Sequence, residues 1–371
     1  MIGCKGVPAA TAQGGGIETH VEALALGLVE KGHRVTVYVR GYANPGHRVT
    51  WKGIRLIELP SLHFKNLDAI THSFLASIHT LCHPCDVIHY HGVGPSTVAW
   101  IPRLFRPDKK VVVTFHSRDR FHEKWGWLAR TYLAYGEWTS VAFPHVTIAV
   151  SHVIQLFCQQ MFHAKRVKHI PNGVTIPSLH PGSDVLASLG LKPNQYFFTL
   201  SRLVAHKAVD DVIRAFAEVQ TTKKLVVIGY ATYDDVAYEQ KLQRLAAKDP
   251  RVILVGKQQG LALQQLIANG YAMVHASRSE GLSVAILEGM SYAKAVIMSD
   301  IPENLEVIDH SGIAFHLGDI ASLREVLQMA VDDPTLIEER GLRAREVVKT
   351  LYSWQSVIDR TERLYKELLA V

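Results

Sequence analysis

The chain of 371 residues lacks the features that mark several large classes of protein. Its four cysteines are too few for the disulfide framework of a secreted protein. No apolar run approaches the roughly 18 residues that a membrane-spanning helix needs. The first residues, Met1–Gly6, show no basic segment followed by an apolar stretch, so we expect no signal peptide. These absences favour a cytoplasmic globular protein.

Disorder is also excluded as the main state of the chain. Hydrophobic residues make up 48% of the sequence and charged residues 20%. That apolar content is high enough to offset the conformational entropy of the chain. The length favours two domains over one.

Basic residues concentrate in the first half. Residues 1–175 contain 19 Lys and Arg against 10 Asp and Glu, a net charge of +9, whereas the remainder contains 21 against 24. Fifteen of the 20 histidines also lie in residues 1–175. The asymmetry predicts an acidic partner for the first half, and nucleic acid, phosphorylated substrates and anionic membrane are the alternatives.

Short β-type runs alternate with amphipathic helical stretches along the whole chain. The runs are almost continuously apolar, as expected for parallel strands that are covered by helices on both faces. The nine runs are Arg34–Val39, Asp86–His91, Lys110–Phe115, Val146–Val150, Tyr196–Leu200, Lys224–Gly229, Arg251–Gly256, Tyr271–His275 and Ala295–Met298. The pattern predicts an α/β fold of two Rossmann-like parallel-sheet domains with a site in the cleft between them.

The domain boundary is expected between Pro171 and Pro193, where Pro, Gly, Ser and His accumulate without periodicity. The predicted N-terminal domain covers residues 1–175, and the predicted C-terminal domain covers residues 176–353. Residues 354–371 have apolar side chains at mixed helical spacing. We expect them to form a terminal helix, and packing back onto the N-terminal domain is one of its options.

A glycine-rich stretch, Gln13–Glu18, opens a predicted amphipathic helix. Glycine lets a backbone approach a ligand closely, and a helix N-terminus offers free N–H groups to a phosphate. A flexible turn between a strand and a helix explains the same residues equally well. The G-x-G-x-x-G fingerprint of dinucleotide-binding proteins is absent here.

Charged side chains follow predicted strands of the second domain. Arg202 and Lys207 lie five residues apart and can clamp a diphosphate, although two solvated surface cations would look the same. Glu280 lies in a polar loop, and Glu288 lies roughly 7–9 Å along the helix that follows. One carboxylate can then reach a sugar beside a phosphate and the other can reach hydroxyls on its far side. A helix-dipole Glu with a surface Glu is the alternative.

In order and spacing, these motifs resemble the family 4 retaining glycosyltransferases of the GT-B fold, from Gly15 to about Glu306. The matching elements are G-G-I-E at Gly15–Glu18, T-F-H at Thr114–His116, N-G at Asn172–Gly173, Ser201–Arg202 with Lys207, and E-x7-E at Glu280–Glu288. Gly3–Pro8 together with Gly15–Glu18 looks most like the branch that builds bacterial surface polysaccharides.

The resemblance implies a role for each matched residue. Glu280 would face the transferred sugar, and Glu288 would bind the ribose hydroxyls of the nucleotide. Arg202 and Lys207 would neutralise the departing diphosphate, and His116 would face the donor sugar from the N-terminal domain. The other donor-binding residues would be Gly15, Gly16, Asn172, Gly281, Leu282 and Ser283. Neither a metal nor a cofactor is implied.

Three features depart from the family pattern. Ser201 stands where many relatives have Gly, and Ala208 follows Lys207 where relatives have Gly, which leaves the conformation of that loop open. At the N-terminus, Met1–Gly3 leaves room for only a very short first strand, unless the true start lies upstream and a sheet edge is exposed.

Two other groups invite functional interpretations. Cys82 and Cys85 form a single C-x-x-C pair, which is weak evidence for zinc even with His79, His89 and His91 nearby in sequence, so we expect reduced thiols. Aromatic and basic residues mix over residues 118–138. A helix that lines an acceptor cleft or touches membrane would have this composition, and so would a helix packed in the N-terminal domain. The aromatic members are Trp125, Trp127, Tyr132, Tyr135 and Trp138, and the basic members are Arg118, Arg120, Lys124 and Arg130.

The sequence as a whole predicts a metal-independent retaining glycosyltransferase. It would move a sugar from a nucleotide-diphosphate sugar to a hydroxyl of a saccharide or lipid-linked acceptor in bacterial glycan synthesis. A non-catalytic nucleotide-sugar-binding protein of the same fold is the alternative; an epimerase fits the motifs less well, and no nucleic-acid partner is expected. The expected location is the cytoplasm, and the inner membrane face is an option if the basic half contacts anionic lipid.

Overall fold

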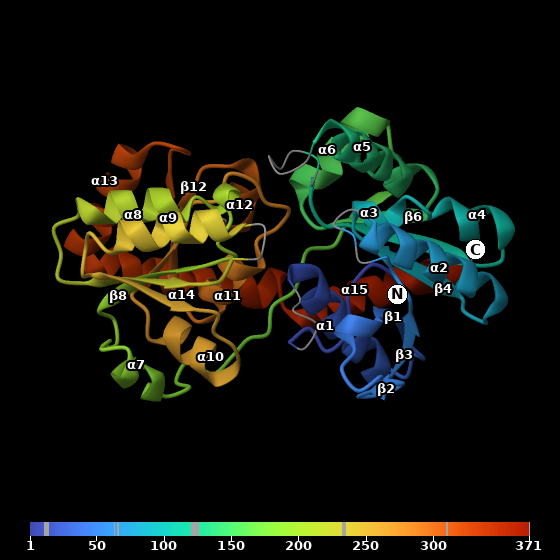
Figure 1. Cartoon of the computed structure of the whole chain (residues 1–371), viewed down its shortest axis with the longest axis horizontal. Helices are drawn as coiled ribbons and strands as arrows, with labels where there is room; N and C mark the ends of the chain where they lie inside the picture. The colour runs from blue at the N-terminus through green and yellow to red at the C-terminus, as the bar shows by residue number, and fades with distance from the viewer. Residues whose placement is uncertain are drawn as a thin grey trace. The chain divides into compact units, whose positions relative to one another are not determined.

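The computed structural model describes residues 1–10, 15–62, 64, 67–118, 120, 126–231, 235–308 and 311–370. The chain divides into two compact units (Figure 1). Unit 1 comprises Met1–Gly173 with Trp354–Val371, and unit 2 comprises Val174–Ser353. These limits lie two residues from the predicted boundary at 175/176. None of the described helices is long and apolar enough to cross a membrane.

Unit 1 contains two sheets. A three-stranded sheet has the order β1-β3-β2, and a four-stranded sheet has the order β4-β5-β6-β7. The strands are β1 (Thr36–Arg40), β2 (Thr50–Trp51), β3 (Ile54–Leu59), β4 (Val87–His91), β5 (Lys110–Phe115), β6 (Val146–Ala149) and β7 (Val167–His169). All neighbours pair in parallel except β2 with β3.

The first residues of the chain join these two sheets. Ile2 forms a parallel bridge with Tyr90 of β4: the Ile2 N–H donates to the His89 carbonyl at 2.9 Å, and the Ile2 carbonyl accepts from the His91 N–H at 2.8 Å. On the other side, the Tyr38 N–H of β1 donates to the Met1 carbonyl at 3.1 Å. The first strand is therefore reduced to a single bridge, and both of its edges are paired.

Helices cover both faces of the unit 1 sheets. The helices are α1 (Gly16–Glu30), α2 (Asp68–Cys82), α3 (Val93–Ser96), α4 (Trp100–Phe105), α5 (Trp127–Ala142), α6 (His152–Phe162) and α15 (Trp354–Leu369), with a 3₁₀ turn η1 (Gly41–Ala43). Along β5, Val112 packs in one core with residues of α1 and α15, and Val111 and Val113 pack in another with residues of α2 and α4. This alternation explains why the strand is apolar at every position.

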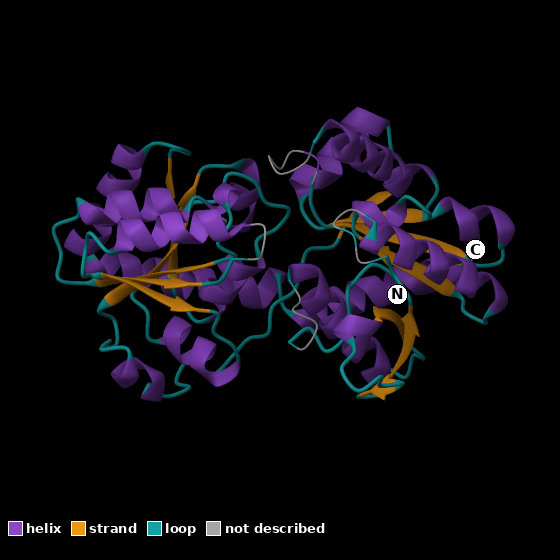
Figure 2. Ribbon diagram, viewed as in Figure 1, coloured by secondary structure: helices purple, strands orange, loops and turns teal. Residues whose placement is uncertain are grey.

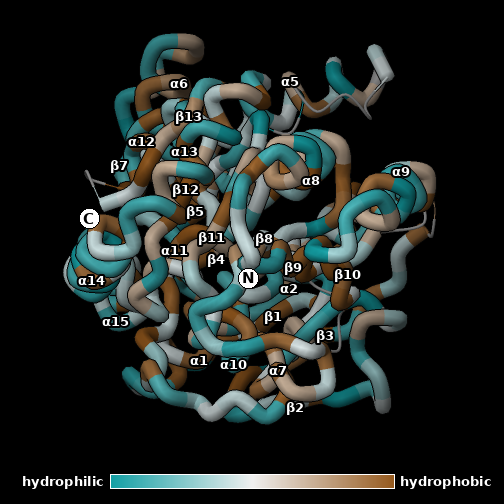
Figure 3. The backbone as a smooth tube through the Cα atoms, turned by 90° about the vertical axis from the view of Figure 1, so that its left-hand side faces the viewer, coloured by the Kyte–Doolittle hydropathy of each residue, from teal (hydrophilic) through white to brown (hydrophobic). Residues whose placement is uncertain are grey.

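Unit 2 is built on one parallel sheet with the order β10-β9-β8-β11-β12-β13. Its strands are β8 (Tyr196–Leu200), β9 (Lys224–Ile228), β10 (Val252–Gly256), β11 (Ala272–His275), β12 (Ala295–Ser299) and β13 (Ile313–Phe315). Figure 2 shows helices on both sides of these strands. Figure 3 shows the hydropathic contrast between the apolar sheet and the polar outer helix α14 (Pro334–Leu351).

The helices of unit 2 fall into two layers. Figure 1 shows α8, α9 and α13 over one face of the sheet, and α7 and α10 over the other. Besides α14, the helices are α7 (Asp184–Ser188), α8 (Val209–Ala217), α9 (Val236–Ala246), α10 (Gly260–Ala268), α11 (Val284–Ser291), α12 (Pro302–Ile308) and α13 (Ile320–Asp332), with a 3₁₀ turn η3 (Ala205–Lys207). Two parallel-sheet units confirm the predicted α/β class.

Candidate active site

In unit 2, the polar residues singled out in the sequence gather where neighbouring strands end. Strand β8 leads into the loop that carries Arg202 and Lys207, and strand β11 leads into the loop that carries Glu280. Because β8 and β11 are adjacent parallel strands, their carboxyl ends lie side by side. The Lys207 ammonium consequently forms an ion pair with Glu280 Oε1, across 73 residues of sequence.

A third side chain, His275, contacts the same carboxylate. The His275 Nε2 lies 2.8 Å from Glu280 Oε1 and, because a carboxylate only accepts, the imidazole donates. His275 is 2% exposed and also lies 3.3 Å from the Ser283 hydroxyl. Burial alone would raise the pKa of Glu280, but Lys207 and His275 hold that pKa well below its usual range. Glu280 is therefore an ionised, oriented carboxylate.

The N-terminus of α11 follows directly. Gly281 and Leu282 are buried, and Ser283 caps the helix by accepting from the Ile286 N–H at 3.4 Å. Glu288 lies one turn further along and is half-buried, and burial raises its pKa to about 7. Glu280 and Glu288 therefore differ: the Lys207 ammonium and a hydrogen bond from His275 compensate the charge of the first, and among the described residues the second has no such compensation.

Arg202 lies in the same loop as Lys207 but is exposed, and within the described chain it forms no ion pair. The two positions that depart from the family pattern flank this loop. Ala208 adopts the left-handed conformation at φ 49°, which glycine adopts without strain. The Ser201 hydroxyl is buried and has no hydrogen-bond partner among the described residues. At position 208, alanine adopts the left-handed conformation that the loop requires at a cost in backbone strain.

In unit 1, His116 belongs to a buried group of imidazoles. His116 follows the end of β5, His91 ends β4, and His20 comes from the second turn of α1. One ring nitrogen from each lies within 4.8 Å of the others, and His91 Nδ1 is 3.4 Å from His116 Nε2. The predicted residue Asn172 joins the group, because its Oδ1 accepts from His20 Nδ1 at 3.0 Å.

These imidazoles are neutral. Burial lowers the pKa of His20 to about 4, against the opposing effect of the Asn172 hydrogen bond. Burial, followed by the neighbouring imidazoles, lowers the pKa of His91 and of His116 well below the usual value. Neutral imidazoles at this spacing are the ligands that a late transition metal prefers. They are equally suited to donate and accept hydrogen bonds with sugar hydroxyls.

Gly15 and Gly16 begin α1, with Gly15 at the N-cap. The Glu18 carboxylate takes part in this turn, since it accepts from the Gly15 N–H at 2.7 Å and from the Lys5 N–H at 3.0 Å. Glu18 therefore fixes the path of the chain into the helix. The preceding glycine of the motif, Gly14, lies outside the described residues.

The C-x-x-C pair and the aromatic helix are placed as follows. Cys82 is exposed and Cys85 is half-buried, both thiols are free, and neither belongs to a group of three close metal-binding side chains in the described part of the chain.

In α5, Trp127 is 75% exposed and Tyr135 and Trp138 are each 43% exposed. Tyr132 instead contacts the Thr97 hydroxyl at 2.5 Å. The helix is thus partly packed and partly exposed, and Trp125 and Lys124 lie outside the described residues.

Sequence reasoning missed His275 and His20. His275 was assigned to a strand, and its position as the last residue of that strand was the available signal. His20 comes two residues after the G-G-I-E motif, and only the helical spacing from Gly16 could have indicated its direction.

Comparisons with known proteins agree with this architecture. The model of Glycosyltransferase Family 4 matches residues 14–176, and the model of Glycosyl transferases group 1 matches residues 194–333. The gpi3 subunit of phosphatidylinositol N-acetylglucosaminyltransferase from Schizosaccharomyces pombe is 24% identical over 96% of this chain and 78% of its own. The N-acetyl-alpha-D-glucosaminyl L-malate synthase of Bacillus anthracis is 28% identical over 44% of this chain and 43% of its own.

Solved structures show the same fold. Sucrose-phosphate synthase from Thermosynechococcus elongatus superposes with a TM-score of 0.83 at 20% identity, covering 96% of this chain and 94% of that one. HepE from Anabaena, determined with UDP and glucose, gives a TM-score of 0.79 at 18% identity, covering 95% and 96%. The two family models, which together span most of the sequence, and the paired parallel-sheet units lead to one assignment: the chain belongs to the family 4 glycosyltransferases and has the GT-B fold.

Proposed function

We propose that the chain is a retaining, metal-independent glycosyltransferase that transfers a sugar from a nucleotide-diphosphate sugar to a hydroxyl of a saccharide or lipid-linked acceptor in bacterial glycan synthesis. The observation that carries the proposal is the Lys207–Glu280–His275 group at the carboxyl ends of β8 and β11. It combines a cation for a leaving phosphate with an ionised carboxylate for an electron-poor sugar.

In the proposed mechanism, each charged side chain stabilises the opposite charge that develops during the reaction. Departure of a nucleoside diphosphate leaves an oxocarbenium-like sugar and a growing negative charge on the leaving oxygen. Arg202 and Lys207, with the N–H groups at the start of α11, stabilise that negative charge in place of a divalent cation. Glu280 stabilises the sugar, and the desolvated carboxyl of Glu288 regains hydrogen bonds from ribose hydroxyls. His116 binds the donor sugar as a neutral partner.

Relatives suggest which donor and acceptor to test. HepE was determined with UDP-glucose, and the yeast relative is named for transfer of N-acetylglucosamine to phosphatidylinositol. The first supports a UDP-sugar as the first donor to examine. The second supports a lipid-linked acceptor beside a soluble saccharide.

The experiment begins with thermal shifts against UDP-, GDP-, ADP- and dTDP-sugars, because a ligand that binds the native state raises the melting temperature. Turnover of the donor that shifts the protein most is then measured with and without EDTA, and NMR of the product reports its anomeric configuration. Activity that EDTA abolishes and magnesium restores contradicts the metal-independent mechanism. Tight donor binding without turnover on any acceptor favours the non-catalytic alternative, for which the Ser201 and Ala208 departures are the evidence.

Membrane contact is a separate part of the proposal. The exposed Trp127, Tyr135 and Trp138 of α5, with the exposed Arg130, form a surface that suits anionic headgroups. Co-sedimentation of the whole chain with phosphatidylglycerol vesicles tests it. Trp127→Ala with Arg130→Ala should reduce binding severalfold, and Leu351→Ala in unit 2, which removes a similarly exposed apolar side chain, should not. Unchanged binding leaves electrostatic attraction of nucleotide-sugars as the role of the basic half.

A further inference from the structure

Unit 2 contains a second concave site, at the edge of the sheet opposite to the Lys207–Glu280 pair. The cavity has a volume of about 690 Å³, within the range of small-ligand sites. Four lining residues each immediately precede a strand: Gln195 before β8, Lys223 before β9, Tyr271 before β11 and Lys294 before β12. The cavity therefore lies at the amino ends of the strands, and a nucleotide-sugar bound at their carboxyl ends does not fill it.

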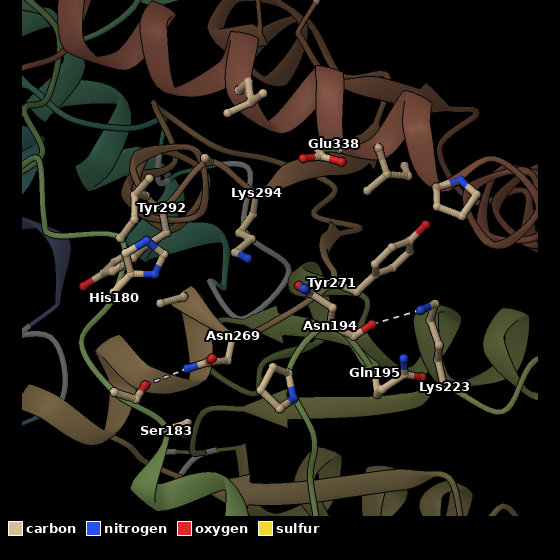
Figure 4. Close-up of a pocket in the computed structure, with 18 residues that line it drawn as sticks. His180, Ser183, Asn194, Gln195, Lys223, Asn269, Tyr271, Tyr292, Lys294 and Glu338 are labelled. Atoms are coloured by element: carbon tan, nitrogen blue, oxygen red, sulfur yellow. Dashed lines mark hydrogen bonds between the residues drawn. The ribbon is translucent and has the colours of Figure 1, made fainter.

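Of the two lysines that line this cavity, Lys294 has no polar partner among the described residues. Figure 4 shows its side chain extending into the open space between Tyr292 and Tyr271. Within the described chain, its ammonium forms neither a hydrogen bond nor an ion pair, and the side chain is half-buried. Burial lowers the pKa of Lys294 to about 8, so the fold destabilises this charge without compensating it. An anion beside the ammonium would supply that compensation.

The second lysine of the cavity is already engaged. The Lys223 ammonium donates to the Asn194 carbonyl at 2.9 Å and lies 3.9 Å from the centre of the Tyr271 ring (Figure 4). It fixes the tyrosine ring at the cavity wall by a cation–π contact. Lys223 therefore shapes the site, whereas Lys294 is available to a ligand.

The remaining walls suit a polar ring compound. Asn269 borders the cavity, and its amide nitrogen donates to the carbonyls of Gly182 at 2.8 Å and Gln265 at 2.9 Å, so the side chain can offer a ligand only its oxygen, as an acceptor. Tyr271 and Tyr292 supply aromatic surface, on which sugar rings pack through their C–H groups. The exposed carboxylate of Glu338 also borders the cavity and opposes an anion there.

We propose that this cavity is a second ligand site, which binds a small organic anion of monosaccharide size through the Lys294 ammonium. It is distinct from the donor site, yet α11 connects the two: the helix begins at Val284, after its cap Ser283 beside the Glu280 loop, and ends at Ser291, just before Tyr292 and Lys294. A ligand at Lys294 can therefore influence the segment that carries Glu288. The site stands independently of the proposed transferase mechanism.

Isothermal titration of the whole chain with glucose 6-phosphate, glucuronate and glucose, at constant ionic strength, tests the proposal. Both anions should bind at least tenfold more tightly than glucose. Lys294→Met should weaken glucose 6-phosphate binding at least tenfold, and Lys294→Arg should keep it within about threefold, because Lys and Arg both offer a cation to a phosphate. Glu338→Gln should strengthen binding severalfold by removing a repulsive charge.

Two control variants locate the binding. Lys248→Met, at an exposed lysine of unit 2 outside the cavity, should leave binding unchanged, and so should Arg202→Ala at the donor loop. The proposal is wrong if the anions bind no better than glucose, or if a folded Lys294→Met protein binds like the parent. It is also wrong if Arg202→Ala abolishes binding, since the anion then occupies the donor site.

Discussion

The two units use the same strand-end geometry for opposite electrostatics. In unit 1 the ends of β4 and β5 present His91 and His116, which are buried and neutral. In unit 2 the ends of β8 and β11 present Lys207 and Glu280, which are partly buried, with side chains 14% and 10% exposed, and ion-paired. A buried group must either be neutral or have a compensating partner, and each unit takes one of these two solutions.

The difference shows how little the net charge of a unit says about the charges at its strand ends. Residues 1–175 carry a net charge of +9, which suggests a positive site in unit 1. The residues matched to the donor sugar there are uncharged, and basic residues such as Arg34 and Arg130 are exposed at the surface. Other basic residues of unit 1, Arg40 and Lys109, are buried away from these imidazoles, and Lys207, the cation that pairs with Glu280, comes from the unit with the slightly negative sequence.

The largest expected effect comes from removing either partner of the Lys207–Glu280 ion pair of unit 2. Lys207→Ala and Glu280→Ala should each lower turnover by roughly 10²-fold or more, as removal of a group that stabilises developing charge does. Because the two side chains share one ion pair, the double variant should lose much less than the product of the single losses. Lys241→Ala, which breaks the Lys241–Asp210 ion pair of the same unit, is the control and should retain turnover. Full additivity would show that the pair does not act as a unit.

The neutral imidazoles of unit 1 predict how the free energy of unfolding changes at acidic pH. The pKa of His20 is about 4 in the fold and near 6.5 when unfolded, so the unfolded chain binds the proton first. Stability from this residue is therefore complete above pH 6.5 and falls as the pH drops towards 4, by about 2 kcal/mol at pH 5. His20→Gln should reduce the loss of stability between pH 7 and pH 5, measured by urea denaturation. His316→Gln, at an exposed histidine paired with Asp300, should not reduce it.

Glu288 belongs to the same unit as the Lys207–Glu280 ion pair, but among the described residues no cation compensates the burial of its carboxyl. Its folded pKa of about 7 exceeds the unfolded value of 4.5, so its contribution is fully present below pH 4.5 and is lost as the pH rises through 7. Glu288→Gln should leave stability unchanged at pH 4.5 and raise it by about 1–2 kcal/mol at pH 8, less than the full shift gives because the side chain retains solvent contact. A gain that is equal at both pH values would contradict the assignment.

The smallest effect concerns two left-handed alanines of unit 2. Ala208 and Ala293 have φ values of 49° and 57°, but Ala208 is buried and Ala293 is half-buried. Glycine relieves roughly 1 kcal/mol of strain at either position, and at Ala208 it also removes a buried methyl group worth about as much. Ala208→Gly should therefore change stability by less than about 0.5 kcal/mol, and Ala293→Gly should be the more stable variant. Thermal melting compares the two.

Much of the fold could be predicted from the sequence because buried parallel strands are apolar at every position. Tyr196–Leu200 was predicted with the bounds that the structure has. Strand β3 was missed because its buried and exposed residues alternate along Ile54–Leu59. Strands β7 and β13 were missed because three residues are too few to show a hydrophobic periodicity. Length and continuity of the apolar run therefore decided which strands were found.

The site was predicted unevenly for a different reason. The spacing of Glu280 and Glu288 is local, so the motif located both on one loop and helix. The ion pair of Glu280 with Lys207 and the hydrogen bond from His275 depend on which strands are neighbours, and strand order is not written in any local pattern. The roles given to Arg202, His116 and the donor-binding residues remain predictions.

Helix α15 completes the core of unit 1, so a protein that lacks this helix would lose part of that core. Val357, Ile358 and Leu364 of α15 are buried with residues of α1, and the Tyr365 hydroxyl contacts His89 Nδ1 at 2.5 Å. Unit 2 is thus an insertion whose ends meet at the Val174–Ser353 bridge. A stop codon after Ser353 would leave unit 2 whole and would remove part of the core of unit 1, some 180 residues upstream. Mutations that disrupt Trp354–Leu369 should therefore behave as folding defects of the N-terminal half.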